Sequence, residues 1–143
     1  MASAKMLNLE KVKARLAKLP NQVKVAVGTQ LAKEVEDLTE AIQRAAPVRD
    51  DLQRHPGQLR DSVHFYPNPD RPLSYRVLAD AKDKKGEFIG PHVEHGHKAV
   101  DGSHVPRVPF FFPTYRARKK AMQRRIKAAG RKAVKAQFSD EAS

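Results

Sequence analysis

The apolar positions in the first third of the chain recur at steps of three and four residues, which is the period of an α-helix. A short stripe of this kind lies between residues 5 and 19 and ends at Pro20, because the residue before a proline avoids the helical region. The next stripe is the longest in the chain and predicts a helix over about residues 21–46, which Pro47 stops. It consists of Val23, Val27, Leu31, Val35, Leu38, Ile42 and Ala45. We therefore expect N-terminal helices over about residues 5–46.

From residue 57 the pattern changes to alternation of apolar and polar residues, which is the period of a β-strand. Residues 58–66 and 73–79 are expected to pair as a hairpin across a proline-rich turn. Residues 88–93 are expected to form a third strand. The alternation thus predicts a small antiparallel sheet over about residues 57–97.

The last part of the chain is expected to be a loop over residues 98–112, followed by a long helix over about residues 113–138. Pro113 fits the first turn of that helix, where no backbone hydrogen bond is lost. The chain of 143 residues has room for one modest core. The sequence therefore predicts a single α+β domain with N-terminal helices, a small antiparallel sheet and a long basic C-terminal helix.

The C-terminal helix also carries much of the chain's excess charge of +12. Residues 114–138 include no acidic residue, and such a helix suits phosphate groups or an acidic protein surface. A solvated helix without a partner is the simplest alternative. The candidate contacts with DNA phosphates or with a partner are Arg116, Arg118, Lys119, Lys120, Arg124, Arg125, Lys127, Arg131 and Lys132.

A cluster of histidines and one carboxylate invites comparison with metal sites, since imidazole and carboxylate groups bind zinc and related ions. On the expected strand, however, His92 and Glu94 would share one face while His95 would point to the other. We therefore expect no metal site. A metal-dependent hydrolase remains a minor alternative, built on His92, Glu94, His95 and His104, with His97 nearby.

Other signs of catalysis are absent from the sequence. No Gly-x-Ser-x-Gly elbow surrounds a serine, the glycines are scattered singly, and the chain has no cysteine. We expect no catalytic, cofactor-binding or metal-binding residues and no enzymatic activity. The apolar runs are too short for a membrane span of roughly 20 residues, and the N-terminus lacks a secretory core, so we expect synthesis in the cytoplasm.

Four short phrases occur in a fixed order along the chain. They comprise Ala46, Pro47 and Val48; Gly57, Leu59, Arg60, Ser62 and Val63; Val93, Glu94 and Gly96; and Pro106, Pro109, Phe110 and Pro113. In this order they resemble a family of neck and tail-completion proteins of long-tailed bacteriophages, which includes minor tail components and head–tail joining proteins. The chain departs from the family pattern by an insertion at residues 49–56 and by a short, proline-rich segment at residues 66–88.

The resemblance implies a structural virion protein rather than an enzyme. It implies a homo-oligomeric, hexameric ring at the head–tail junction. The ring would act as a tail terminator, a tail-completion protein or a neck protein. Its partners would be the tail-tube and head-connector proteins, and genomic DNA would pass through its lumen. The protein would assemble in the host cytoplasm and end in the virion. The expected assembly interface is Val93, Glu94, His95, Gly96, Pro109 and Phe110. The alternative is a small basic protein that binds nucleic acid by itself.

Overall fold

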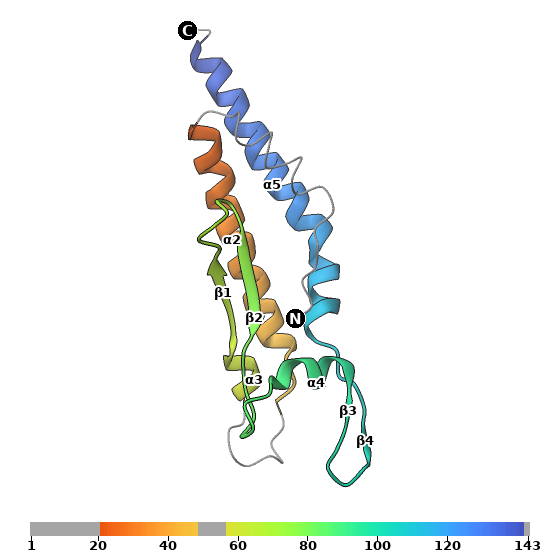
Figure 1. Cartoon of the computed structure of the whole chain (residues 1–143). Helices are drawn as coiled ribbons and strands as arrows, with labels where there is room; N and C mark the ends of the chain where they lie inside the picture. Colours follow the sequence, from red (N-terminus) through yellow and green to blue (C-terminus); the bar gives the residue numbers. More distant parts are fainter. Residues whose placement is uncertain (1–20, 49–56, 142–143) are drawn as a thin grey trace.

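The computed structural model describes residues 21–48 and 57–141 of the chain, and Figure 1 shows their arrangement. Two long helices lie side by side, a β-hairpin runs along one of them, and short helices and strands gather near the end where the first helix stops. The fold is therefore α+β, as the sequence predicted. In chain order the elements are α2 (Asn21–Ala45), α3 (Gln58–Asp61), β1 (Val63–Pro67), β2 (Tyr75–Ala79), α4 (Ile89–His95), β3 (His97–Lys98), β4 (His104–Val105) and α5 (Phe111–Glu141).

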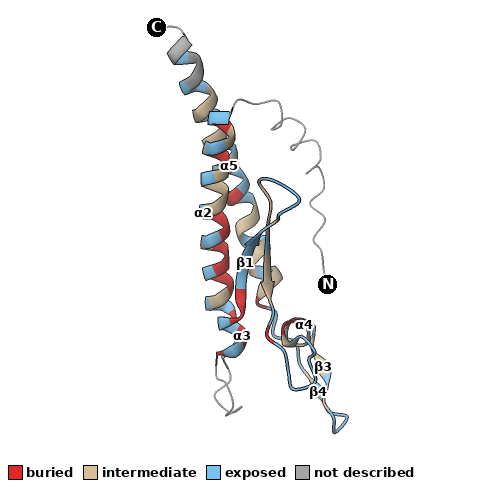
Figure 2. Cartoon of the chain, turned by 60° about the vertical axis from the view of Figure 1, so that its left-hand side comes forward, coloured by how far each residue is buried: buried red, intermediate tan, exposed pale blue. Residues whose placement is uncertain are grey.

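Helix α2 confirms the prediction of a long amphipathic helix. The stripe residues Val23, Val27, Val35, Leu38 and Ile42 are buried, and Figure 2 shows the buried residues along one side of this helix. At its end the prediction is wrong by one position. Ala45 is exposed and Ala46 is buried instead, just after the last helical residue. The expected helix over residues 5–19 lies outside the described residues.

Helix α5 runs antiparallel to α2, and the two pack along their length (Figure 1). The seam between them is narrow, because small residues let the helices approach closely. A Cβ atom added at Gly130 would lie 3.3 Å from the side chain of Val27. Met122 is buried in the same core as Leu38. The helix begins at Phe111, two residues earlier than predicted, with Pro113 inside its first turn.

Strands β1 and β2 form the predicted antiparallel hairpin, with Val63 opposite Ala79 and Pro67 opposite Tyr75. The hairpin is held against α2 by side chains at both ends. The Gln43 amide donates a hydrogen bond to the Val63 carbonyl at 2.9 Å. Near the turn, Leu73 lies so close to Gly28 that a Cβ atom there would be 3.0 Å from it. The hairpin therefore covers α2 without a larger sheet.

Two predicted strand segments are wrong. Residues 58–61 form the single turn α3 rather than the start of a strand, because Gly57 with φ 84° starts a turn in which the Asp61 and Ser62 amides bond back to residues 57 and 58. Residues 89–95 form α4 rather than a third strand. Gly90 and Glu94, four residues apart, are its buried positions, which is the spacing of a helix.

The segment assigned to a loop contains a second, very small hairpin. Strands β3 and β4 pair antiparallel through His97 with Val105 and Lys98 with His104. In the described ranges, no helix has the length and apolar character needed to cross a membrane.

Candidate functional site

The junction between α4 and α5 is built around a buried carboxylate. Glu94 is only 6% exposed and accepts three backbone hydrogen bonds from the start of α5. One oxygen accepts from Phe110 N at 2.8 Å and Phe111 N at 3.0 Å, and the other accepts from Phe112 N at 3.1 Å. These amides have no partner within their own helix, and negative charge is favourable at a helix N-terminus. Glu94 is therefore the N-terminal cap of α5, supplied by another helix.

The residues expected to form an assembly interface all lie around this junction, in different environments. Phe110 is buried in the core and Val93 packs against the core, whereas His95 and Pro109 are exposed. Glu94 uses both carboxylate oxygens within the chain. An intersubunit role for this set stays a prediction, and its exposed members are the ones still free to contact another protein.

Gly96 closes the junction between α4 and β3. Its φ of 77° and ψ of 164° suit glycine, and an added Cβ would lie 2.9 Å from the Val105 carbonyl oxygen and 3.1 Å from the Arg107 nitrogen. These are backbone atoms that cannot move aside cheaply. The turn thus fixes the β3–β4 hairpin against the end of α4.

We expect Gly96→Ala to lower the free energy of unfolding by about 2 kcal/mol, from backbone strain and the clash together. Chemical denaturation followed by circular dichroism measures this. Gly102→Ala is the matched control, because Gly102 has a φ of 82° but no atom within 4 Å of the added Cβ. Equal losses in the two variants would show that the close approach at Gly96 contributes nothing.

The histidines near this junction do not form a chelating set. His92 Nε2 lies 3.5 Å from a Glu87 carboxylate oxygen, and the His92 and His97 rings are 5.2 Å apart. His97 Nδ1 is buried without a hydrogen-bond partner in the described part of the chain. Glu94 is occupied by the α5 cap. Among the described residues, no three His, Asp or Glu side chains are placed to hold a metal ion.

The cations of α5 fall into two groups. Arg125 faces α2, where its guanidinium donates to both carboxylate oxygens of Glu34 at 2.6 and 2.8 Å. This hydrogen bonding holds the pKa of Glu34 below its ordinary value and raises the pKa of Arg125. Arg118 and Lys119 are half-buried, and the Lys119 ammonium lies 5.9 Å from the Tyr115 ring centre. These three candidates therefore belong at least partly to the packing of the subunit.

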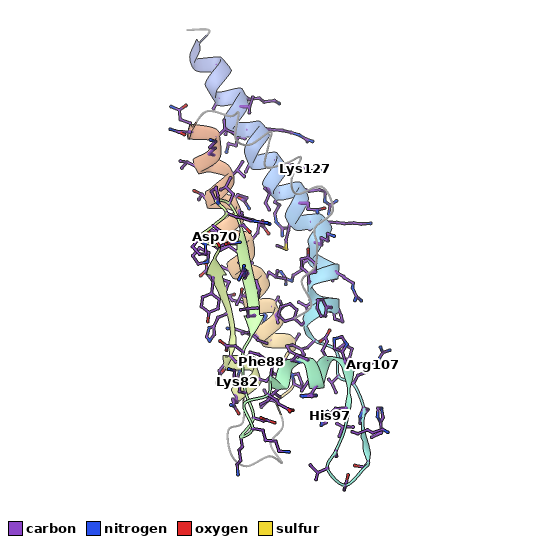
Figure 3. The ribbon with its side chains drawn as sticks, in the orientation of Figure 1. Asp70, Lys82, Phe88, His97, Arg107 and Lys127 are labelled. Carbon is purple, nitrogen blue, oxygen red and sulfur yellow. The ribbon has the colours of Figure 1, made fainter. Side chains whose placement is uncertain are left out.

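The remaining cations are exposed, and most lie on one side of the helix. We call this set the α5 basic stripe: Arg116, Lys120, Arg124, Lys127, Arg131 and Lys135. Lys127 is labelled in Figure 3, and the surface is hollowed between it and its neighbours Lys120, Gln123 and Arg124. Lys132 is also exposed but lies off the stripe. Lys135 was not among the candidate contacts, although its spacing from Arg131 places it on the same face.

The contacts of Glu94 and Glu34 could not be predicted from the sequence, because both are long-range. Glu94 bonds to amides 16 to 18 residues later, and Glu34 pairs with a residue 91 positions away. The one available signal was the position of Glu34 beside the apolar stripe of α2, where a carboxylate is expected to need a partner.

Comparisons of the chain with protein-family models, with curated proteins and with solved structures found no match.

Proposed function

We propose that the protein is a structural subunit of a homo-oligomeric ring at the head–tail junction of a long-tailed bacteriophage. In this role it joins the tail tube to the head connector and leaves a lumen for the genome. The observation that carries the proposal is the convergence of the four sequence phrases, which carry the resemblance, onto one core.

Each phrase contributes an apolar residue to this core. Ala46, Leu59, Val63 and Phe110 are buried in one cluster, and Val93 packs against it. The backbone also comes close there, because a Cβ atom at Gly90 would lie 3.4 Å from Ala79 and 3.8 Å from Leu59. Phrases separated by many residues thus form one structural unit. This supports a resemblance of the whole fold, and not only of separate short sequence phrases.

Exposed apolar side chains beside this core offer surfaces for subunit contact. Val108, next to Pro109, is 48% exposed, and Phe88 at the start of α4 is 49% exposed. Phe88 is labelled in Figure 3, close to Lys82 and beside α4. Assembly by such surfaces requires shape complementarity and no chemical step.

The α5 basic stripe favours a second candidate function, which is a small nucleic-acid-binding protein that acts without forming a ring. Such a protein needs only a cationic surface that tracks phosphates. The two candidates differ in oligomeric state in the absence of nucleic acid.

Negative-stain electron microscopy with light scattering on nuclease-treated protein tests the proposed function. We expect closed rings at high concentration, with a pore wide enough for duplex DNA. Val108→Asp should reduce ring formation, because it places a charge on an apolar contact surface. Val100→Asp is the matched control, since Val100 is fully exposed in the β3–β4 loop. A strict monomer at every concentration would contradict the proposal and favour the second candidate.

A further inference from the structure

The six cations of the α5 basic stripe are aligned along one narrow face of the helix. Their successive spacings are four, four, three, four and four residues. At 100° per residue this keeps them within an arc of about 100°, and at 1.5 Å per residue they extend over about 28 Å. Neighbouring charges are thus about 6 Å apart along the axis. The stripe is a linear array of positive charge.

The packing of α5 fixes the direction in which this array points. Met122, Arg125 and Gly130 occupy the face toward α2, and the bidentate Glu34–Arg125 pair fixes the rotation of the helix. At 100° per residue, the stripe lies on the side of α5 away from Met122 and Arg125, with Gly130 beside one of its edges. The fold therefore presents the stripe outward, on a helix that packs against α2.

The described part of the chain offers no compensating negative charge for this face. None of the six cations pairs with an acidic side chain among the described residues, and the sequence has no Asp or Glu from residue 102 to residue 139. Like charges at these spacings weaken a helix by about 0.2–0.5 kcal/mol per pair. Because this repulsion between like charges destabilises the free subunit, we expect a partner with negative charge that neutralises the stripe.

A second copy of the chain is a poor partner for the stripe. The exposed charges of α2 are mixed, with Glu36 and Glu40 interspersed with Lys33 and Arg44, and Glu40 already lies 3.6 Å from Arg44. The other acidic residues of the described chain are scattered over helices and loops, and the buried Glu34 and Glu94 are already bonded within the chain. A polymer with regularly repeated negative charge fits the array better.

We propose that the α5 basic stripe contacts the phosphate backbone of double-stranded DNA. The duplex carries one negative charge per about 1.7 Å of axis, so its charge density complements a linear array of cations. Stacking on single strands needs exposed aromatic side chains, and the stripe includes none. Contacts of this kind carry no sequence information. The inference deepens the proposed function by naming what α5 contacts, and it rests on that function only for the identity of the DNA as the genome.

Fluorescence anisotropy with the full chain and labelled 30-base-pair duplexes of two unrelated sequences tests the proposal. The triple variant K120Q/K127Q/K135Q removes three charges from the stripe. K82Q/K84Q/K85Q is the matched control, because it removes the same charge from three exposed lysines of the loop before α4. Residues 1–20 carry further cations, so the difference between the two variants is the readout.

We expect the stripe variant to bind both duplexes at least tenfold more weakly than the control at about 100 mM salt. Its slope of log affinity against log salt should be smaller than the wild-type slope by about 2.7, or 0.9 per lost contact. Equal weakening of duplex binding in the two triple variants would overturn the proposal. So would tighter binding of the wild type to one labelled strand of the duplex alone than to the duplex itself. Stripe-dependent binding to polyglutamate as tight as to the duplex would overturn it in favour of an acidic protein partner.

The same variants separate this inference from the proposed function. If the protein forms rings but the stripe variant binds duplex DNA as tightly as the control variant, the inference about α5 is wrong and the proposed function stands. Stripe-dependent binding by a protein that stays monomeric would uphold the inference and sink the ring.

Discussion

Glu94→Ala is expected to lower the free energy of unfolding by about 3 kcal/mol. The substitution removes the acceptor for three backbone amides at the start of α5, one of which belongs to the buried residue Phe110. Losing a helix cap costs about 0.5–2 kcal/mol, and each buried donor left without a partner costs about 1–3 kcal/mol. The favourable interaction of the carboxylate with the helix dipole is also lost.

Thermal and chemical denaturation followed by circular dichroism measure this loss. For a chain of this size we expect a fall in Tm of about 10 °C. Glu94→Gln should lose less, because its side-chain carbonyl can still accept part of the bonding. Glu87→Ala is the control of equal charge change, since the Glu87 side chain is 64% exposed. A Glu94→Ala variant as stable as Glu87→Ala would show that α5 does not depend on this cap.

The long elements could be predicted from the sequence because their signals repeat. The stripe of α2 repeats over seven apolar positions, so one irregular residue does not hide it. The alternation in β1 and β2 is equally local, and turn-forming prolines separate the two strands. Helix α5 was predictable from its length and composition, although Phe111 and Phe112 resembled the end of a loop.

The short elements could not be predicted, because tertiary contacts decide them. Helix α4 has seven residues, and its first turn contains Gly90 and Pro91, which have low helix propensity. One of its buried positions is Glu94, whose charge hides the apolar period. Helix α4 is stabilised by the hydrogen bond that the Glu94 carboxylate accepts at the start of α5, 16 residues further on, and a local sequence pattern does not contain this contact.

The positive charge of α5 was predictable from the sequence, but the face of the helix on which it lies was not. Its seam with α2 is rich in alanine and too narrow to mark the buried side by hydrophobicity. Arg125 resembled its neighbours in sequence, and only the fold pairs it with Glu34. Composition therefore located the charge, and packing decides which cations remain available.

Arg125→Ala is expected to destabilise the protein by about 3 kcal/mol, more than Glu34→Ala does, although both remove the same ion pair. The asymmetry follows from burial, because the Glu34 side chain is 2% exposed and the Arg125 side chain is 50% exposed. Removing Arg125 leaves a buried carboxylate without its cation, for which losses of about 3–5 kcal/mol are typical. Removing Glu34 leaves a guanidinium that water can reach, so about 1–2 kcal/mol is expected. Arg124→Ala, in the exposed stripe, is the neighbouring control and should change stability by less than about 0.5 kcal/mol.

The penalty of Arg125→Ala should also shrink as the pH falls. The hydrogen bond from Arg125 is the main cause of the lowered pKa of Glu34, and burial opposes it. A carboxyl group with a lowered folded-state pKa contributes stability that is present above its unfolded pKa of about 4.3 and is lost as the pH falls through the folded value. Without Arg125, burial becomes the largest influence on Glu34 and favours its neutral form, so acid should cost the variant less than it costs the wild type. Urea unfolding of both proteins from pH 7 to pH 3 measures the difference, and a penalty independent of pH would show that Arg125 does not lower the pKa of Glu34.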